Sequence, residues 1–106
     1  MDVKRVKIDE GRGVAVVFGE EIPLARRFLK GDGWKWCIYA DKLRENVKYD
    51  VIGVNLRGEV AGVFFGYYRP SMLAIDVYPV WAPPGIRYRR TKVAERVFEM
   101  RGASKK

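Results

Sequence analysis

The side chains in this chain that could do chemistry are aromatic and basic. There is no histidine and only one cysteine, Cys37. The usual general base, the Ser-His and Cys-His nucleophile pairs and a cysteine zinc site therefore cannot be built. In contrast, the chain has 21 Lys and Arg against 13 Asp and Glu, a net charge of +8, and 13 % aromatic residues. This balance favours binding of an anionic partner over catalysis, and nucleic acid is the commonest such partner.

The basic residues gather in two segments. Arg87-Tyr-Arg-Arg-Thr-Lys92 places four cations and a tyrosine close together, and Arg26 and Arg27 are adjacent earlier in the chain. We expect the first segment to open a helix, where cations oppose the helix dipole and gain nothing locally. A phosphate-bearing partner would compensate that cost, whereas a solvated helix face is the structural alternative.

The stretch Val60–Tyr68 reads as a strand with apolar or aromatic residues on both faces. If Arg57-Gly58 is the hairpin loop, Ile52 faces Val63, and Phe65 and Tyr67 continue a face that we assign to the helices. The opposite face carries glycines among aromatic residues, and glycine inside a strand is explained by close approach of another group. This face comprises Tyr49, Val51, Gly53, Asn55, Val60, Gly62, Phe64, Gly66 and Tyr68.

Aromatic rings beside cations are what proteins use to bind single strands, because bases stack on the rings at about 1–3 kcal/mol each. The structural alternative is that these rings pack under the loop 80–86 or in a homodimer. Trp34 and Trp36 share a strand face; core packing is favoured for them, and an exposed stacking role is the alternative. The predicted nucleic-acid-binding residues are Arg26, Arg27, Tyr49, Phe64, Tyr68, Trp81, Arg87, Tyr88, Arg89, Arg90 and Lys92.

The elements that would position these residues indicate an α+β fold in a single domain, residues 1–106, with a basic tail at 103–106. We expect an antiparallel, hairpin-rich sheet of about five to six strands, packed on one face by two main helices. The predicted strands are 3–9, 13–18, 34–39, 51–56, 59–68 and 72–80. The predicted helices are 20–31 and 87–101, with a helical turn at 41–46.

The segment Leu73-Ala-Ile-Asp-Val-Tyr-Pro79, with Gly85 after it, resembles the acetyl-CoA-dependent N-acetyltransferase superfamily. In that family a hairpin leads into a strand ending in Val-x-Pro, then a loop Arg/Gln-x-x-Gly-x-Gly/Ala and a helix. The resemblance covers about half the chain. It departs from the pattern at Ala82 and Arg87, and Pro83-Pro84 removes amides that would bind a pyrophosphate. It therefore implies a degenerate acetyltransferase-like domain.

These observations give three hypotheses. The first is a small protein that binds single-stranded DNA or RNA with little sequence specificity, with no catalytic residue, metal or cofactor. The second is a protein-interaction module, such as a homodimer, and the third is the degenerate acetyltransferase. No signal peptide or membrane span is visible, so we expect a cytoplasmic protein. The absence of glutamine and the many charges favour a thermophilic archaeon or its virus as the source.

Overall fold

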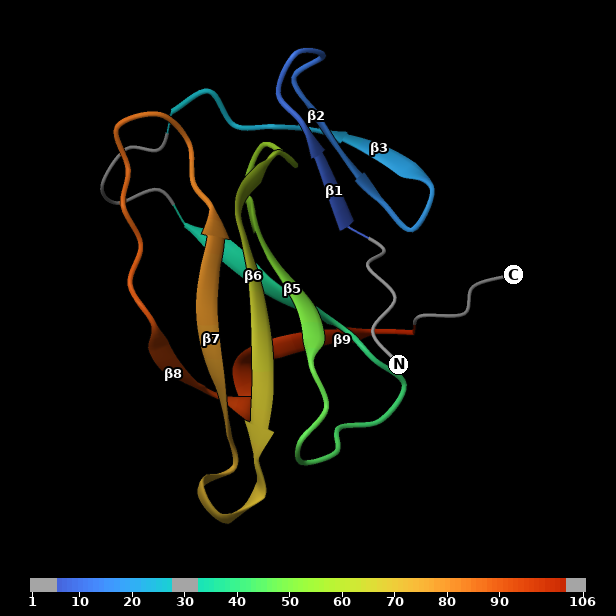
Figure 1. Ribbon diagram of the computed structural model, residues 1–106, viewed down its shortest axis with the longest axis vertical. Coiled ribbons are helices and arrows are strands. Elements are labelled where there is room, and N and C mark those ends of the chain that lie inside the picture. The colour runs from blue at the N-terminus through green and yellow to red at the C-terminus, as the bar shows by residue number, and fades with distance from the viewer. Residues whose placement is uncertain (1–5, 28–32, 103–106) are drawn as a thin grey trace.

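The computed structural model describes residues 6–27 and 33–102, and in this part of the chain it is built from strands and two short 3₁₀ turns (Figure 1). No α-helix is present among the described residues, so the predicted α+β fold with two main helices is wrong. The strands are β1 (Val6–Asp9), β2 (Val14–Val17), β3 (Glu20–Pro23), β4 (Trp34–Tyr39), β5 (Tyr49–Asn55), β6 (Val60–Arg69), β7 (Ala74–Trp81), β8 (Thr91–Ala94) and β9 (Phe98–Arg101). The 3₁₀ turns are η1 (Pro70–Met72) and η2 (Glu95–Val97).

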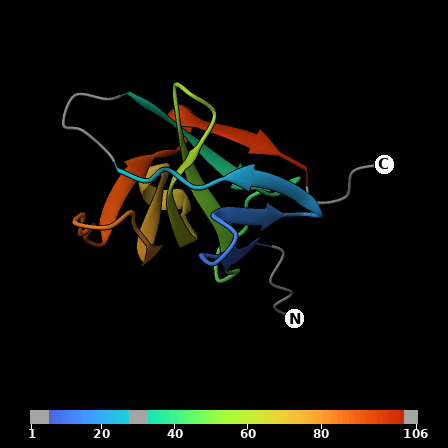
Figure 2. The ribbon, with the colours of Figure 1, turned by 90° about the horizontal axis from the view of Figure 1, so that it is seen from above.

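The larger sheet has the strand order β8-β7-β6-β5-β4-β9, antiparallel except for the parallel pair β4–β9. Its two edge strands, β8 and β9, are separated in the chain only by η2. A link this short brings the two edges close together, so the sheet has to curl (Figure 2). One face of the sheet therefore becomes an interior, and the other becomes an outer face.

The smaller sheet, in the order β1-β2-β3, packs on the outer face of the larger sheet. Val6, Ala15 and Val17 from the small sheet share a core with residues of β4, β5 and β6. At the edge of this contact, Trp81 Nε1 donates a 2.6 Å hydrogen bond to Glu10 Oε2 in the β1–β2 turn. The small sheet thus takes the place that the sequence assigned to the helices.

The predicted helix 20–31 is replaced at its start by β3. Phe18 and Gly19 have φ values of 50° and 88°, the positive-φ pair of a type I′ turn that joins β2 to β3 in a hairpin. The backbone of Ile22 pairs with that of Ala15 on β2. Pro23 ends the edge strand, where proline is tolerated. Residues 28–31 of the prediction lie outside the described residues.

The predicted helix 87–101 is replaced by β8, η2 and β9. Val93 pairs with Ile75 on β7, whereas Phe98 pairs with Trp36 on β4. Residues that the helical pattern placed on one face therefore lie at two opposite edges of the curled sheet. Thr91 and Val93 are β-branched, and such residues fit a strand better than a helix. The predicted helical turn at 41–46 is irregular chain ending in a turn, with Asn46 at a φ of 67°.

The predicted register of the β5–β6 hairpin is confirmed through most of its length. Ile52 pairs with Val63 and Val51 with Phe64, as expected from a loop at Arg57-Gly58. A bulge at Gly53/Val54 then shifts the pairing. Asn55 closes the turn, because its side-chain Oδ1 accepts hydrogen bonds from the backbone N–H groups of Arg57 and Glu59.

Candidate nucleic-acid interface

The predicted stacking face lies inside the curl of the larger sheet. Phe64 is only 2 % exposed, and its ring centroid lies 5.0 Å from that of Trp36 and 5.4 Å from that of Tyr88. Trp34 lies 4.9 Å from Trp36, and Trp36 lies 5.6 Å from Phe98. These rings form an aromatic cluster in which Phe64 and Phe98 are buried, and Trp34 and Trp36 pack against this core while partly buried, as the core-packing interpretation expected.

The glycines on this face accommodate the protein's own rings. A Cβ atom on Gly53 would lie 2.5 Å from the Trp34 ring, and one on Gly62 would lie 3.0 Å from Tyr88 Cε2. The close approach that the glycines predicted therefore exists, and the approaching groups are tryptophan and tyrosine side chains of the same chain.

The hydroxyl groups of the predicted tyrosines have structural partners. Tyr49 is buried and donates to the Lys42 carbonyl, Tyr88 donates to the Ala61 carbonyl at 2.7 Å, and Tyr68 donates to Glu95 Oε1 at 2.8 Å. Burial raises the pKa of the Tyr88 hydroxyl. The hydrogen bond to Glu95 raises the pKa of Tyr68. These hydroxyls hold loops against the sheet.

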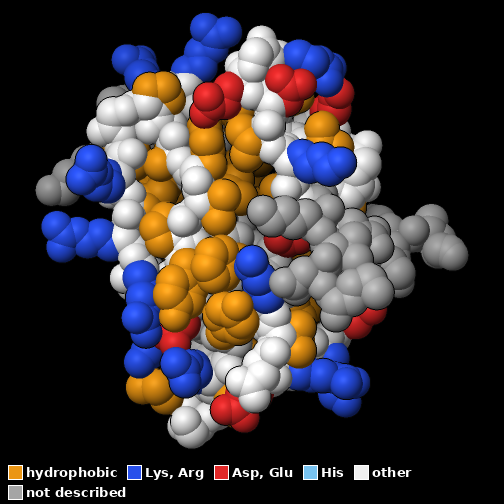
Figure 3. Space-filling model, viewed as in Figure 1, with side chains coloured by type: hydrophobic (Ala, Val, Ile, Leu, Met, Phe, Trp, Pro, Cys, Tyr) orange, Lys and Arg blue, Asp and Glu red, His pale blue; other side chains and the backbone are white. Residues whose placement is uncertain are grey.

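A different set of aromatic residues lies on the outer face of β6 and β7. We call Phe65, Tyr67 and Tyr78 the outer aromatic surface. All three are partly exposed. They lie on the same face of the larger sheet as Val63. Val63 is the last residue of β6 in the core that the described residues form beneath the small sheet. Figure 3 shows hydrophobic side chains over β6 and β7, with Lys and Arg side chains along the left edge of this view.

Two rings of this surface stack across the strands. Phe65 pairs with Tyr78, and their rings are parallel within 9° with centroids 4.9 Å apart. The Tyr67 ring is perpendicular to both, at 5.9 Å from Phe65 and 6.1 Å from Tyr78. In the described part of the chain, neither tyrosine hydroxyl on this surface has a hydrogen-bond partner, so both stay available to solvent or to a ligand.

Cations cover the outer faces of the stacked pair. Lys48 Nζ lies 4.6 Å from the centroid of Phe65, and Arg90 Cζ lies 5.0 Å from that of Tyr78. Two parallel rings 4.9 Å apart leave no room for a cation between them. Each cation therefore lies on the side away from the other ring, which gives a stack in the order Lys48, Phe65, Tyr78, Arg90.

An ion pair and a further lysine lie at the end of the outer aromatic surface where β6 leads into η1. Arg69 Nε donates to Asp76 Oδ2 at 2.7 Å. Asp76 pairs with Tyr67 on one side and with Lys92 on the other. The aromatic residues are thus flanked by four exposed basic side chains, those of Lys48, Arg69, Arg90 and Lys92.

The structure brings only part of the predicted site together. Arg90 and Lys92 lie beside the outer aromatic surface, whereas Arg87 and Arg89 are exposed in the chain between β7 and β8. Arg26 and Arg27 are exposed after β3, and Trp81 is half-buried against the small sheet. The predicted binding residues did not include Lys48, Phe65, Tyr67, Arg69 or Tyr78. The alternation of Phe65, Tyr67 and Arg69 was a visible signal, but this face was expected to lie under the helices.

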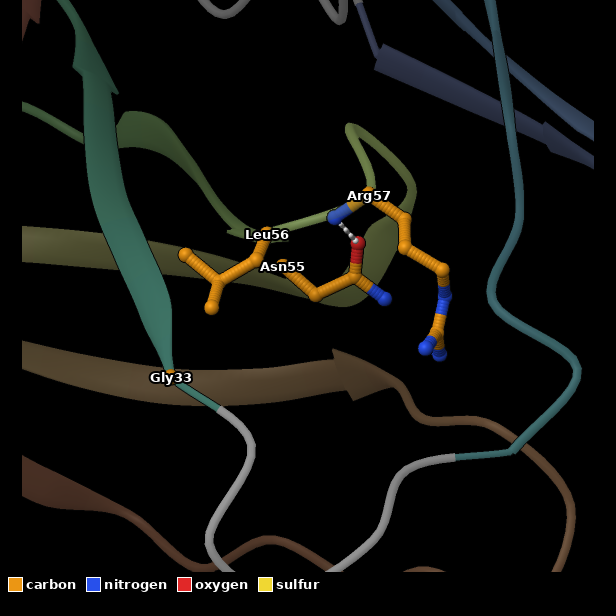
Figure 4. Close-up of a pocket in the computed structure, with 4 residues that line it drawn as sticks. All are labelled: Gly33, Asn55, Leu56 and Arg57. Atoms are coloured by element: carbon orange, nitrogen blue, oxygen red, sulfur yellow. Dashed lines mark hydrogen bonds between the residues drawn. The ribbon is translucent and has the colours of Figure 1, made fainter.

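A small pocket lies at the β5–β6 turn, lined by Gly33, Asn55, Leu56 and Arg57 (Figure 4). Its volume is about 80 Å³, well below the roughly 300–1,000 Å³ of ordinary ligand pockets. The Asn55 amide in its wall is already engaged, since it also donates to Glu59 Oε1. This pocket is therefore a feature of the turn.

The segment that resembles acetyltransferases forms a strand without the helix that the resemblance implies. Leu73–Pro79 largely coincides with β7, and Gly85 lies in the following loop. That loop leads into β8, so no helix N-terminus stands where a pyrophosphate would bind.

Comparisons with protein-family models, with curated proteins and with solved structures found no match. The described residues form no helix with the length and hydrophobicity that a membrane crossing requires.

Proposed function

We propose that this protein binds single-stranded nucleic acid, with little sequence preference, on the outer aromatic surface. The observation that carries the proposal is the set of three partly exposed rings, Phe65, Tyr67 and Tyr78, flanked by four exposed Lys and Arg side chains on one sheet face. Rings supply sequence-tolerant stacking, and cations supply phosphate contacts. The net charge of +8 adds long-range attraction for a polyanion.

The stack of rings and cations favours a single strand over a duplex. A base can reach the outer face of Tyr78 only when Arg90 moves aside, which gives up a cation–π contact of about 0.5–1 kcal/mol at an exposed site. A stacked base returns about 1–3 kcal/mol, and the released guanidinium can bind a phosphate. In a duplex the base faces are already stacked on their neighbours, so duplex bases cannot replace Arg90 on the Tyr78 ring.

The test is fluorescence anisotropy with a labelled single strand and the matching duplex, at about 50 and 200 mM salt. We expect the single strand to bind more tightly and its affinity to fall as salt rises. Equal weak binding of both forms would reduce the interaction to a general attraction for polyanions. Absence of binding at the lower salt would contradict the proposal and favour the protein-interaction hypothesis for the same surface. Trp34 and Trp36 pack against the core on the side of the sheet away from this surface, so tryptophan quenching is a poor readout here.

A further inference from the structure

A carboxylate stands within the basic surface, where simple electrostatics would not place one. Asp76 lies on β7 with its side chain only 4 % exposed, and it is bonded to Arg69 Nε at 2.7 Å. Burying a carboxylate is costly unless it is paired and hydrogen-bonded. Next to a polyanion site, its negative charge would also repel phosphate. A role in orienting a cation accounts for both costs.

The geometry of the ion pair leaves the end of the arginine available. Asp76 engages Nε of Arg69, and in the described part of the chain the two terminal nitrogens of that guanidinium have no protein partner. On the other side of Asp76, Lys92 Nζ lies 3.4 Å from Met72 Sδ, which is a weak acceptor. Two cations therefore flank one anchoring carboxylate, and each keeps donors to offer.

We infer that Arg69 and Lys92 form a phosphate subsite and that Asp76 is the positioning residue that directs Arg69 toward the phosphate. This inference rests on the proposed function, because the phosphate is that of a bound single strand. Nε is held by the protein, so the terminal nitrogens form a fixed pair of donors, and such a pair matches two oxygens of one phosphate. Tyr67, opposite Asp76 in the strand register, is the ring nearest to this subsite along β6.

The decisive variant is Asp76→Asn, because the two explanations predict effects of opposite sign. If Asp76 contributes only its charge, its removal strengthens binding of a polyanion. If Asp76 positions Arg69, its removal weakens binding. We expect about a tenfold loss of affinity for an oligothymidylate of roughly 12 nucleotides, since the ion pair with Arg69 is lost and asparagine offers only a weaker, neutral acceptor. The slope of log affinity against log salt should become shallower by about 0.7, the value for one phosphate contact of a single strand.

Variants at Arg69 keep the test independent of how well Asp76→Asn folds. Arg69→Ala should lose affinity to a similar extent, and Arg69→Lys should recover only part of it, because lysine keeps the charge without the paired donors. In the Arg69→Ala background, Asp76→Asn should cost nothing further. Melting curves and circular dichroism identify any variant that is simply unfolded.

The outcomes separate this inference from the proposed function. A wild-type protein that does not bind the oligomer contradicts the proposed function itself. A wild-type protein that binds, with an Asp76→Asn variant that binds as tightly or more tightly, overturns only the positioning role. If Arg69→Ala binds with the affinity of the wild type, Arg69 is not part of the subsite, and the proposed function itself still stands.

Discussion

Single tyrosines on the outer and inner sides of the larger sheet differ in what their rings touch. Tyr78 is partly exposed and stacked on Phe65, whereas Tyr88 is inside the aromatic cluster and bonded to the Ala61 carbonyl. We expect Tyr78→Ala to weaken single-strand binding by about 1–3 kcal/mol, the value of one base–aromatic stack. Its salt slope should stay near that of the wild type, because no phosphate contact is removed. Anisotropy titrations at two salt concentrations measure both quantities.

The matched control for that substitution is Tyr88→Phe. It removes only a partly buried hydroxyl and its hydrogen bond, so it should lower the free energy of unfolding by about 0.5–1.5 kcal/mol and leave affinity unchanged. An affinity loss in Tyr88→Phe equal to that in Tyr78→Ala would mean that binding follows the stability of the sheet and does not depend on its outer rings.

The glycine beneath Trp34 makes a second prediction at the residue scale. A Cβ atom at Gly53 would meet the Trp34 ring at 2.5 Å, so Gly53→Ala should destabilise the protein by about 1–3 kcal/mol through overpacking. Gly11→Ala is the control, since its Cβ would find its nearest neighbour, Asp9 Oδ1, at 3.6 Å. Denaturant unfolding compares the two variants. Equal stability of both would show that the tryptophan moves aside freely.

At the scale of elements, β9 forms one edge of the curled sheet, beside β4. Phe98 on β9 is 8 % exposed and packs beside Trp36, while Met100 on the same strand is 43 % exposed. We expect Phe98→Ala to cost about 3–5 kcal/mol and to increase hydrogen exchange along β4. Met100→Ala should cost much less, because less of its surface is buried. Comparable losses in both variants would mean that β9 contributes through its backbone pairing alone.

Elements with a strong alternating pattern could be predicted from sequence, and those defined by tertiary pairing could not. The strand 34–39 was predicted with the bounds that β4 has, and the register around Ile52 and Val63 followed from the Arg57-Gly58 turn. The helix at 87–101 was wrong because Val93 and Phe98 serve two different sheet edges. Apolar residues a few positions apart, such as Val93 and Phe98, can lie on one face of a helix or on two short strands at different edges of a sheet. The local sequence does not distinguish these two arrangements.

For the whole molecule, what packs on each face of the larger sheet decides which of its aromatic rings are exposed. Both faces of β6 are rich in apolar residues, and the sequence assigned the face of Phe65 to the core and that of Phe64 to a ligand. The curl of the sheet buries Phe64, and among the described residues the core beneath the small sheet ends at Val63 on β6. The presence of aromatic rings beside cations on a sheet face was thus predictable from the sequence. Their location depended on layers that only the tertiary fold defines.

Burial of ionisable groups across both cores predicts how the whole protein responds to alkali. Burial raises the pKa of Tyr39 and of Tyr88, so the fold favours their neutral forms. An unfolded tyrosine ionises at a pH of about 10. The stability that these groups contribute is therefore fully present below that pH and is lost as the pH rises through the higher values of the folded protein.

Urea unfolding at a pH of about 7 and of about 10.5 should show this loss, and the double variant Tyr39→Phe/Tyr88→Phe should lose less stability over the same interval. Lysines also lose their charge in this range, which relieves repulsion in a chain of net charge +8. Wild type and variant share these lysines, so the difference between their two changes isolates the buried tyrosines. An equal loss in both proteins would contradict the assignment and would mean that these hydroxyls ionise in the fold as readily as in the unfolded chain.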